Sequence, residues 1–353
     1  FAYLPLRIMA LSRRFLILAE GSFGPLSSKT ANACIRYIPD EVAAVLDSGT
    51  AGRTAHDVLG FGGHIPVVAS FEAGMAQHPT ALLIGIAPAG GQFPDAWRSM
   101  VGDALRAGLD VWSGLHTLLG DDREFAALAA ASGATIRDLR RAPTGLEVAS
   151  GRGRDLDATI VLTVGTDCNI GKMTAQLQVQ SSVRQLGHRV NFAATGQTGI
   201  LVEGRGIAVD AVIADFMAGS IEWLTPDNEA DHWDLIEGQG SLYHVSYSGV
   251  TLALVHGGQP DALVVCHEPT RAHMRGLPGY QLPTLEQVRD TALALARVAN
   301  PDCVVIGYAI NTQHMKEEDA KNYLAEIERG LGLPATDPYR FGAGKLVDAL
   351  ALI

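Results

Sequence analysis

Residues 165–174, with the sequence GTDCNIGKMT, have the composition of a phosphate-binding loop. The apolar run ATIVLTV precedes them and predicts a strand, while AQLQVQSSVRQLG follows them and predicts a helix. In such a strand–loop–helix unit, consecutive backbone N–H groups and the positive end of the helix bind a phosphate. Gly171 lets the backbone approach the ligand closely, and Lys172 can reach the ligand's terminal charge. The predicted ligand-binding residues are Gly165, Thr166, Asp167, Cys168, Asn169, Ile170, Gly171, Lys172, Met173 and Thr174.

The loop departs from the common nucleotide-binding motif at two places. Five residues separate Gly165 from Gly171, where the common motif has four. Met173 occupies the position of the Ser or Thr that binds Mg²⁺, and a hydroxyl follows one place later, at Thr174. The sequence therefore supports a phosphoanhydride ligand more strongly than magnesium-assisted cleavage of that ligand. The plain alternative is a Gly-rich turn with a solvated Lys172.

Cys168 lies inside the loop, and two interpretations of it stay open. A thiol near a helix N-terminus and a lysine can have a lowered pKa and act as a nucleophile. The simpler interpretation is a small loop residue that faces the ligand or the core.

Other polar residues follow predicted strands, where ligands bind in open parallel sheets. The motif IEGQGSLYH places Glu237 at a strand end as a metal ligand or general base, and His244 as a proton-transfer group. A predicted strand over 209–217 brings Asp215 to the same edge, and Asn311 after another strand is suited to read a purine edge. We therefore predict Glu237, His244 and Asp215 as catalytic residues and Asn311 as a ligand-binding residue. Ordinary capping, turn and loop roles are the alternatives.

No cluster of residues at metal-ligand spacing occurs in the sequence, so no metal site is predicted. The four cysteines, at 34, 168, 266 and 303, fit neither a zinc site nor a disulfide framework. Reduced thiols are typical of a cytoplasmic protein, which is the expected location.

Short apolar segments alternate with helical ones along nearly the whole chain, which predicts an α/β fold with mainly parallel sheets. We expect two three-layer α/β/α domains, over 13–145 and 158–353, joined by a charged, Gly-rich linker over 146–157. Residues 1–12 are expected to lie partly outside the folded domain. The predicted strands are 15–21, 41–49, 65–70, 81–91, 108–114, 134–140, 158–165, 189–196, 209–217, 233–240, 261–269 and 302–311.

The bulk composition excludes several classes of protein. Of the 353 residues, 47% are hydrophobic and 18% charged, which is enough to bury a sizeable core. The net charge of -11 argues against a nucleic acid or an anionic membrane as the main partner. The apolar runs are of strand length and too short to cross a bilayer. The N-terminal AEGSFG matches GxGxxG poorly, so an NAD-dependent oxidoreductase is disfavoured.

Seven motifs occur together in order: SKTANACIRY, GIAPAGG, GLDVWSGLHTLLGDD, GTDCNIGKMT, IEGQGSLYH, SYSGVTLALVHG and NTQ. In this combination the chain resembles the bacterial D-glutamate N-acetyltransferase family, a former domain-of-unknown-function family. The resemblance covers nearly the whole chain. It implies an N-terminal Rossmann-like domain and a C-terminal P-loop NTPase-like domain. It also implies an acyltransferase that moves acetyl from acetyl-CoA to the amine of D-glutamate, the entry step of D-glutamate catabolism.

The resemblance implies a role for the loop and for cations elsewhere. Coenzyme A carries a pyrophosphate, which a P-loop can bind without hydrolysis. Glu237 or His244 is then a candidate to deprotonate the amine. The two carboxylates of glutamate require cations and anion-binding backbone, which we expect to converge on an interdomain cleft. The predicted substrate-binding residues are Lys29, Arg36, Arg53, Gly90, Gly91, Arg98 and His116.

Two other functions compete with acetyl transfer. The loop also resembles that of dethiobiotin synthetase, which implies an ATP- and Mg²⁺-dependent kinase or carboxylate–amine ligase. A nucleotide-binding regulatory protein without turnover is the second alternative. In each case we expect a small-molecule ligand and a homo-oligomer.

Overall fold

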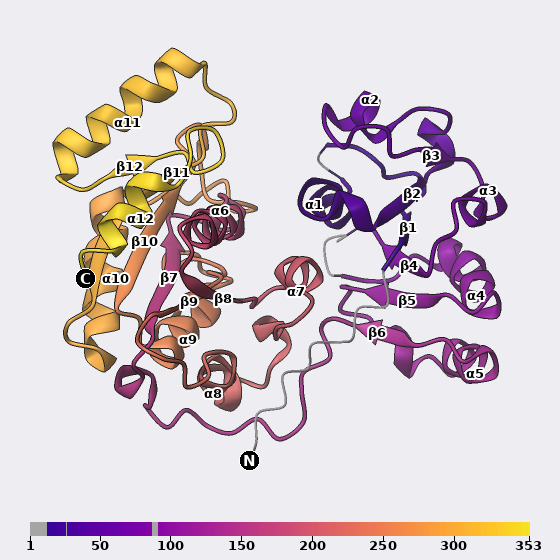
Figure 1. Cartoon of the computed structure of the whole chain (residues 1–353), viewed down its shortest axis with the longest axis horizontal. Helices are drawn as coiled ribbons and strands as arrows, with labels where there is room; N and C mark the ends of the chain where they lie inside the picture. The colour runs from indigo at the N-terminus through magenta and orange to yellow at the C-terminus, as the bar shows by residue number, and fades with distance from the viewer. Residues whose placement is uncertain (1–12, 26, 87–90) are drawn as a thin grey trace. The chain divides into compact units, whose positions relative to one another are not determined.

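The computed structural model describes residues 13–25, 27–86 and 91–353, in two units. One unit contains the described residues up to Ala142 together with Gln197–Ala211. The other contains Pro143–Gly196 and Val212–Ile353. The expectation for residues 1–12 therefore concerns residues outside the described part. Helices cover both faces of the sheet in each unit (Figure 1), which confirms the predicted α/β fold.

The N-terminal unit contains a six-stranded parallel sheet in the order β3-β2-β1-β4-β5-β6. This order reverses direction between β1 and β4, which is the switch point of a Rossmann-like sheet. Its strands are β1 Phe15–Leu18, β2 Val42–Leu46, β3 Val67–Val68, β4 Ala81–Ile84, β5 Asp110–Ser113 and β6 Ile136–Asp138. Its helices include α1 Lys29–Tyr37, α2 Ala55–Leu59, α3 Phe71–Met75, α4 Arg98–Arg106 and α5 Arg123–Ser132.

Strand β1 shows why these strands are continuous apolar runs. Leu16 and Leu18 pack with residues of α4 and α5 in one hydrophobic cluster. Phe15 and Ile17, on the opposite face, pack with residues of α1 in another cluster. Because side chains alternate along a strand and both faces are covered, every position of β1 is buried.

The C-terminal unit contains a second six-stranded parallel sheet, in the order β12-β11-β10-β7-β9-β8. Here the order reverses around β7, so the loop after β7 lies at a switch point. Its strands are β7 Thr159–Gly165, β8 Arg189–Ala193, β9 His232–Ile236, β10 Ala262–His267, β11 Val304–Ile310 and β12 Ala335–Thr336. Its helices are α6 Lys172–Gln185, α8 Ala214–Leu224, α9 Ser248–Gly258, α10 Leu285–Ala299, α11 Glu317–Leu331 and α12 Gly344–Leu350.

A segment from the second half of the sequence belongs to the N-terminal unit. After β8 the chain forms α7 Gln197–Glu203, which packs against α1, and Leu201 joins the cluster that contains Phe15. Arg140 forms an ion pair with Asp210, further along this segment. The N-terminal unit is therefore completed by residues that lie more than fifty positions beyond its last strand.

The strand predicted over 209–217 is wrong. Residues Val209–Ala211 form a short 3-10 helix, and α8 begins at Ala214. Apolar residues recur in this segment with a spacing that also fits a helix, and tertiary packing against α9 decides between the two. The other predicted strands all overlap observed strands, and the two-residue strand β12 was not predicted.

The predicted linker is held against α8. The buried carboxylate of Glu222 accepts hydrogen bonds from the backbone N–H groups of Ser150, Gly151 and Arg152, at 2.7–3.3 Å. Gly219 has no side chain, and a Cβ there would lie 1.9 Å from the carbonyl oxygen of Glu147. This part of the linker is therefore fixed in place by close backbone packing and a buried carboxylate.

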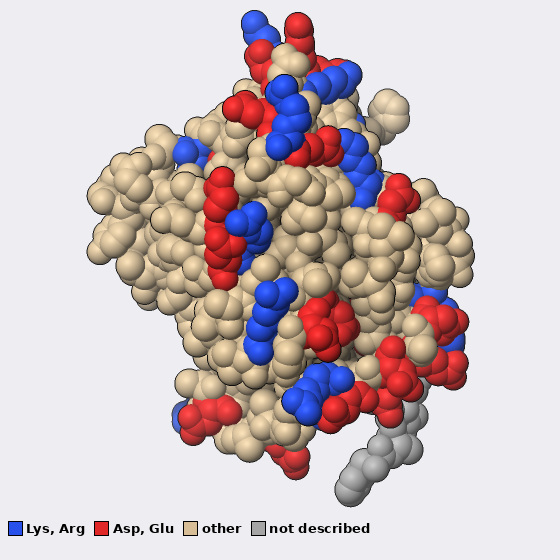
Figure 2. Space-filling model, turned by 90° about the vertical axis from the view of Figure 1, so that its left-hand side faces the viewer, with Lys and Arg blue, Asp and Glu red and all other residues tan. Residues whose placement is uncertain are grey.

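The surface mixes charges of both signs. Figure 2 shows acidic and basic side chains interspersed among uncharged ones on one face. Lys321 pairs with Glu317 along α11, and Lys345 pairs with Glu328. Among the described residues, no helix combines the length and apolar character needed to cross a membrane.

Candidate anion-binding site at the phosphate loop

The loop between β7 and α6 has the geometry of an anion cradle. A Cβ at Gly165 would lie 2.5 Å from Ile170 and 2.7 Å from the carbonyl oxygen of Cys266, so only glycine fits there. Gly171 has a φ of +104°, in the region that favours glycine. Helix α6 begins at Lys172, and the first N–H groups of a helix have no partner within it. The predicted strand–loop–helix unit is thereby confirmed.

Lys172 lies inside this loop rather than on the surface. Only 5% of the residue is exposed, and its Nζ donates a hydrogen bond to the carbonyl oxygen of Asp167 at 2.7 Å. Burial lowers the pKa of Lys172. Exchange of this carbonyl for a phosphate oxygen would give the ammonium a full negative charge as partner.

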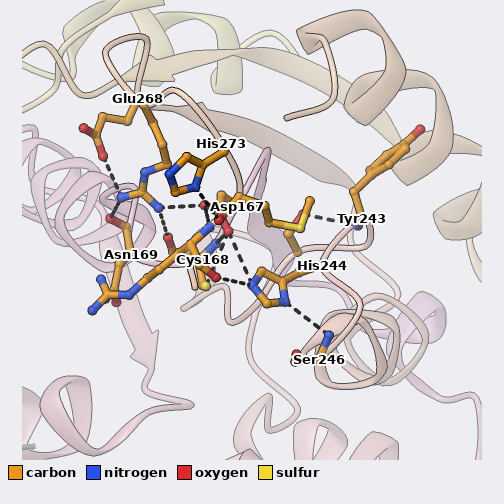
Figure 3. Close-up of polar contacts among 12 residues, drawn as sticks. Asp167, Cys168, Asn169, Tyr243, His244, Ser246, Glu268 and His273 are labelled. Carbon is orange, nitrogen blue, oxygen red and sulfur yellow. Dashed lines mark hydrogen bonds and ion pairs between the residues drawn. The ribbon is translucent and has the colours of Figure 1, made fainter. Parts of the chain in front are cut away.

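Asp167 is the centre of a buried network at the loop (Figure 3). Its Oδ2 accepts hydrogen bonds from Arg271 Nη1 at 2.7 Å and from the backbone N–H of Arg275 at 2.8 Å. Its Oδ1 accepts one from the backbone N–H of Cys168 at 2.7 Å. Burial opposes the charge of this carboxylate, but these hydrogen bonds outweigh burial and lower the pKa of Asp167. Asp167 is therefore an anion whose lone pairs already have protein partners.

Arg271 joins the segment after β10 to the phosphate loop. Its guanidinium also donates to the carbonyl oxygens of Cys168 at 2.7 Å and Asn169 at 3.0 Å, and it pairs with Glu268 at 2.7 Å. Asn169 has a φ of +53°, which is uncommon for a residue with a side chain. The guanidinium thus binds two loop carbonyls and forms ion pairs with two carboxylates, those of Asp167 and Glu268.

His244 is buried beside Asp167, and both of its ring nitrogens have hydrogen-bond partners. Nδ1 accepts a hydrogen bond from the backbone N–H of Ser246 at 3.2 Å. Nε2 must then carry the proton, which it donates to the carbonyl oxygen of Arg275 at 3.0 Å. The same nitrogen lies 3.9 Å from Asp167 Oδ1. This arrangement suits a positioning role for His244, and its predicted role in proton transfer stays a prediction.

Glu237 lies at the carboxyl end of β9, as predicted, and is 3% exposed. Its Oε2 accepts hydrogen bonds from the backbone N–H groups of Thr195 at 3.0 Å and Gly196 at 3.1 Å. Burial raises the pKa of Glu237 to about 7, although these bonds and the charge of Lys172 act in the opposite direction. Glu237 therefore gains its negative charge near neutral pH. That charge interacts electrostatically with the ammonium of Lys172.

Glu237→Gln should change how stability depends on pH. Because folding raises the pKa of Glu237 from 4.5 to about 7, the folded state binds the proton more tightly than the unfolded state. Its contribution to the free energy of unfolding is complete below pH 4.5 and is lost as pH rises through 7, by about 3 kcal/mol. The free energy of unfolding of wild type minus that of Glu237→Gln, measured with urea from pH 4 to 8, should therefore fall as pH rises through 7. Glu326→Gln on exposed α11 is the control, and a constant wild-type minus Glu237→Gln difference would contradict the assignment.

Three potential metal-binding atoms lie within 4.8 Å of one another, in Asp167, Cys168 and His244. Asp167 and His244 already form hydrogen bonds with protein partners. Burial, and then the charge of Asp167, raise the pKa of the Cys168 thiol, which disfavours a thiolate. The cluster is therefore accounted for by hydrogen bonds, and the nucleophile interpretation of Cys168 gains no support.

Of the two remaining candidates in the C-terminal unit, Asn311 lies beside the phosphate loop and Asp215 lies on the exposed start of α8. Asn311 directly follows β11 next to the loop, and a Cβ at Gly171 would lie 3.7 Å from its Cβ. Asp215 is exposed in the first turn of α8. Asp215 was predicted to be catalytic because it would stand near the end of a strand. That strand is absent, so this argument for a catalytic role no longer applies.

The predicted substrate-binding residues belong to the N-terminal unit. His116 packs on Gly91, which has a φ of +60°, and a Cβ there would lie 2.2 Å from the imidazole ring. Arg98 pairs with Asp122 and Glu124. The other cations are exposed: Arg36 lies over the ring of Phe61, Arg53 donates to the carbonyl of Asp57, and Lys29 begins α1. Gly90 lies outside the described residues, and the predicted convergence of these groups stays a prediction.

Sequence reasoning missed Arg275. Neither Arg275 nor Arg271, four residues before it, was given a role from the sequence. The signal was available, because Arg271 and Arg275 stand four and eight residues after β10, whose end lies beside the phosphate loop. The contacts of Asp167 and His244 with the backbone of Arg275 come only from the tertiary structure.

Comparison with known proteins gives consistent matches. Residues 147–347 match the family described as "Domain of unknown function (DUF1611_C) P-loop domain", and residues 48–142 match its N-terminal Rossmann-like domain. A D-glutamate N-acetyltransferase from Tritonibacter scottomollicae is 55% identical over 80% of this chain and 85% of its own length. A protein of the same name from a Pseudoalteromonas species is 40% identical over 75% and 79%. A crystal structure of a DUF1611 family protein from Anabaena variabilis has a TM-score of 0.90 and 38% identity, covering 97% of this chain and all of that one.

Proposed function

This chain belongs to the DUF1611 family, and on that premise we propose that it is an N-acetyltransferase that transfers acetyl from acetyl-CoA to the amine of D-glutamate. The observation that carries the proposal is 55% identity to a protein named for this activity, over most of both chains. Family membership was predicted from the motifs, and an enzyme of the acyltransferase class from the family resemblance, and both are confirmed. The substrates and their sites are the proposal.

The donor is proposed to bind through the pyrophosphate of coenzyme A at the phosphate loop. In support, the loop offers backbone N–H groups at the start of α6 and the buried ammonium of Lys172. The usual Mg²⁺-binding hydroxyl is replaced by Met173, and the Asp167 carboxylate is engaged by Arg271. These features fit a loop that binds phosphates without cleaving them.

This binding mode limits what Glu237 and His244 can do. The pantetheine arm of coenzyme A is about as long as four extended residues, so its thioester lies roughly 14 Å from the pyrophosphate when extended. Both residues lie beside the loop. With pyrophosphate in the loop and an extended arm, they shape the donor site and do not reach the amine. Glu237→Gln tests the earlier prediction, because loss of the amine's base lowers kcat whereas damage to the donor site raises KM for acetyl-CoA.

D-Glutamate brings two carboxylates and an ammonium that must lose a proton before it attacks the thioester. The attack forms a C–N bond and breaks the C–S bond, and the leaving thiolate takes up a proton. The acceptor site is proposed to use N-terminal residues such as His116 and Gly91, which the structure places in contact with each other.

One assay on purified protein tests the proposal. D-glutamate and acetyl-CoA are supplied without nucleotide, and release of free thiol is followed with and without EDTA, with L-glutamate as the control acceptor. Thiol release that requires D-glutamate and is insensitive to EDTA is expected. Absence of thiol release, with ADP or AMP formed once ATP and Mg²⁺ are added, would overturn the proposal in favour of a kinase or ligase.

A further inference from the structure

Asn311 lies at the end of β11, beside Gly171 of the phosphate loop. A Cβ at Gly171 would lie 3.7 Å from Asn311 Cβ and 3.8 Å from Asn311 Nδ2. Strand β10 stands between β7 and β11 in the sheet (Figure 1), and backbone hydrogen bonds join the three strand ends. The N–H of Thr166 donates to the carbonyl oxygen of Cys266 at 3.1 Å. The N–H of Asn311 donates to that of His267 at 2.8 Å, so Asn311 is fixed at the same sheet edge as the loop.

The side-chain amide of Asn311 has a defined orientation. Its Oδ1 accepts a hydrogen bond from the backbone N–H of Gln313 at 3.2 Å, which the amide nitrogen could not do. The nitrogen Nδ2 lies next to Gly171. An amide oxygen has two lone pairs, so Oδ1 can accept a second hydrogen bond, while Nδ2 carries two N–H donors. The partly exposed Asn311 thus offers a donor and an acceptor side by side, next to the loop.

A donor beside an acceptor is the pattern that recognises adenine. The adenine edge formed by N7 and N6 pairs with an Asn side chain through two hydrogen bonds, whereas guanine has two acceptors on that edge. Coenzyme A carries adenosine on the pyrophosphate that the loop is proposed to bind. Adjacent strands lie about 4.8 Å apart, so the end of β11 stands about 10 Å from the end of β7. This separation leaves room for the ribose between the phosphate and the base.

A buried carboxylate holds the turn that follows Asn311. Asp337 directly follows β12 and is 3% exposed, and its Oδ2 accepts hydrogen bonds from the N–H and the hydroxyl of Thr312 at 2.8 and 2.7 Å. Its Oδ1 accepts hydrogen bonds from the N–H groups of Tyr339 and Arg340 at 3.0 and 3.1 Å. These four donors compensate for the burial of the charge. Asp337 therefore joins the turn after β12 to the residue that follows Asn311.

Arg340 binds the same turn through its guanidinium. Its Nη1 donates hydrogen bonds to the carbonyl oxygen of Thr312 at 2.7 Å, to the hydroxyl of Thr312 at 3.0 Å and to the carbonyl oxygen of Met315 at 3.1 Å. The N–H, hydroxyl and carbonyl of the fully buried Thr312 are thus all bound by Asp337 or Arg340. Because the backbone of Thr312 continues that of Asn311, these contacts restrict where the Asn311 amide can lie.

We propose that Asn311 selects the adenine of acetyl-CoA, and that Asp337 and Arg340 are positioning residues that hold Asn311 for this contact. The proposal rests on the proposed function, because it takes the loop as the pyrophosphate site. A purine contact by Asn311 was predicted from the sequence, and the structure adds the preference for adenine and the two residues that support it. A side chain held in place before binding loses less conformational freedom when the ligand arrives.

The first test compares coenzyme A with an analogue that carries guanine in place of adenine, by calorimetry with EDTA present. Wild type should bind coenzyme A roughly 10- to 100-fold more tightly, because guanine presents an acceptor to Asn311 Oδ1. Asn311→Ala should lose most of this preference through weaker binding of coenzyme A. Asn322→Ala changes an exposed asparagine on α11, and this control should keep the wild-type preference.

The outcomes separate the inference from the proposed function. Base recognition is refuted, and the proposed function stands, if wild type binds both ligands equally well or if Asn311→Ala keeps the preference. An equal loss of affinity for both ligands in Asn311→Ala also refutes it, because the contact then concerns a part that the two ligands share. If wild type binds neither ligand, the proposed donor site fails, and the inference fails with it.

The second test concerns the two positioning residues. Arg340→Ala and Asp337→Asn should both reduce the preference for adenine, whereas lower stability alone reduces the binding of both ligands alike. Arg340 is only partly buried, so its variant serves if Asp337→Asn does not fold. The double variant of Asn311→Ala with Arg340→Ala should show the same preference as Asn311→Ala, because both changes remove one contact. Arg329→Ala on α11 is the control, and a wild-type preference in Arg340→Ala would refute the positioning role.

Discussion

Replacing Lys172 with methionine should raise the KM for acetyl-CoA about 100-fold. Lys172 supplies the buried ammonium of the phosphate loop, and its Nζ is held 2.7 Å from a loop carbonyl that a phosphate oxygen can replace. A charge-assisted hydrogen bond of this kind contributes about 3 kcal/mol to binding, which corresponds to roughly 100-fold in affinity. Methionine keeps an apolar stem of similar length, so the packing of α6 is retained. Steady-state kinetics with D-glutamate at saturation measure the effect.

Two comparisons make the Lys172 result specific. Lys321→Ala removes a surface lysine that pairs with Glu317 on α11, and its KM should equal that of wild type. The thermal unfolding of Lys172→Met should show a folded protein, because removal of a buried charge relieves its desolvation. An unchanged KM in a folded Lys172→Met variant would refute the role of the loop in binding the donor.

Replacing Arg271 with alanine should lower the free energy of unfolding by about 3–5 kcal/mol, because it leaves the buried carboxylate of Asp167 without its cation. Asp167 is fully buried, and its ion pair with Arg271 measures 2.7 Å. The variant also frees the carbonyl oxygens of Cys168 and Asn169 from their donor. Urea unfolding at neutral pH measures the loss.

The double variant Arg271→Ala with Asp167→Asn shows whether the stranded charge causes that loss. Removal of the carboxylate's charge should restore part of the stability lost in Arg271→Ala. The control is Arg106→Ala, which breaks an exposed pair with Asp103 and should change stability by less than about 1 kcal/mol. If Arg271→Ala is as stable as this control, the buried ion pair does not hold the loop.

The strands and the phosphate loop were predictable because their causes are local. The run FLIL of β1 is buried on both faces, and a continuous apolar run is what such a strand requires. The anion cradle depends on Gly165, Gly171 and Lys172, which stand within eight positions of one another. The segment 209–217 was mistaken for a strand because a short apolar run fits both periodicities, and only its packing against α9 makes it helical.

The sequence by itself thus determined two parallel α/β units, the place of the phosphate loop and the family. Backbone conformation and burial of apolar runs follow from neighbouring residues, which the sequence displays directly. The tertiary structure decided which groups meet. Arg271 reaches Asp167 across 104 positions, and His244 meets the backbone of Arg275 across 31. Such partners depend on the order of β7, β9 and β10 in the sheet, and no local pattern encodes that order.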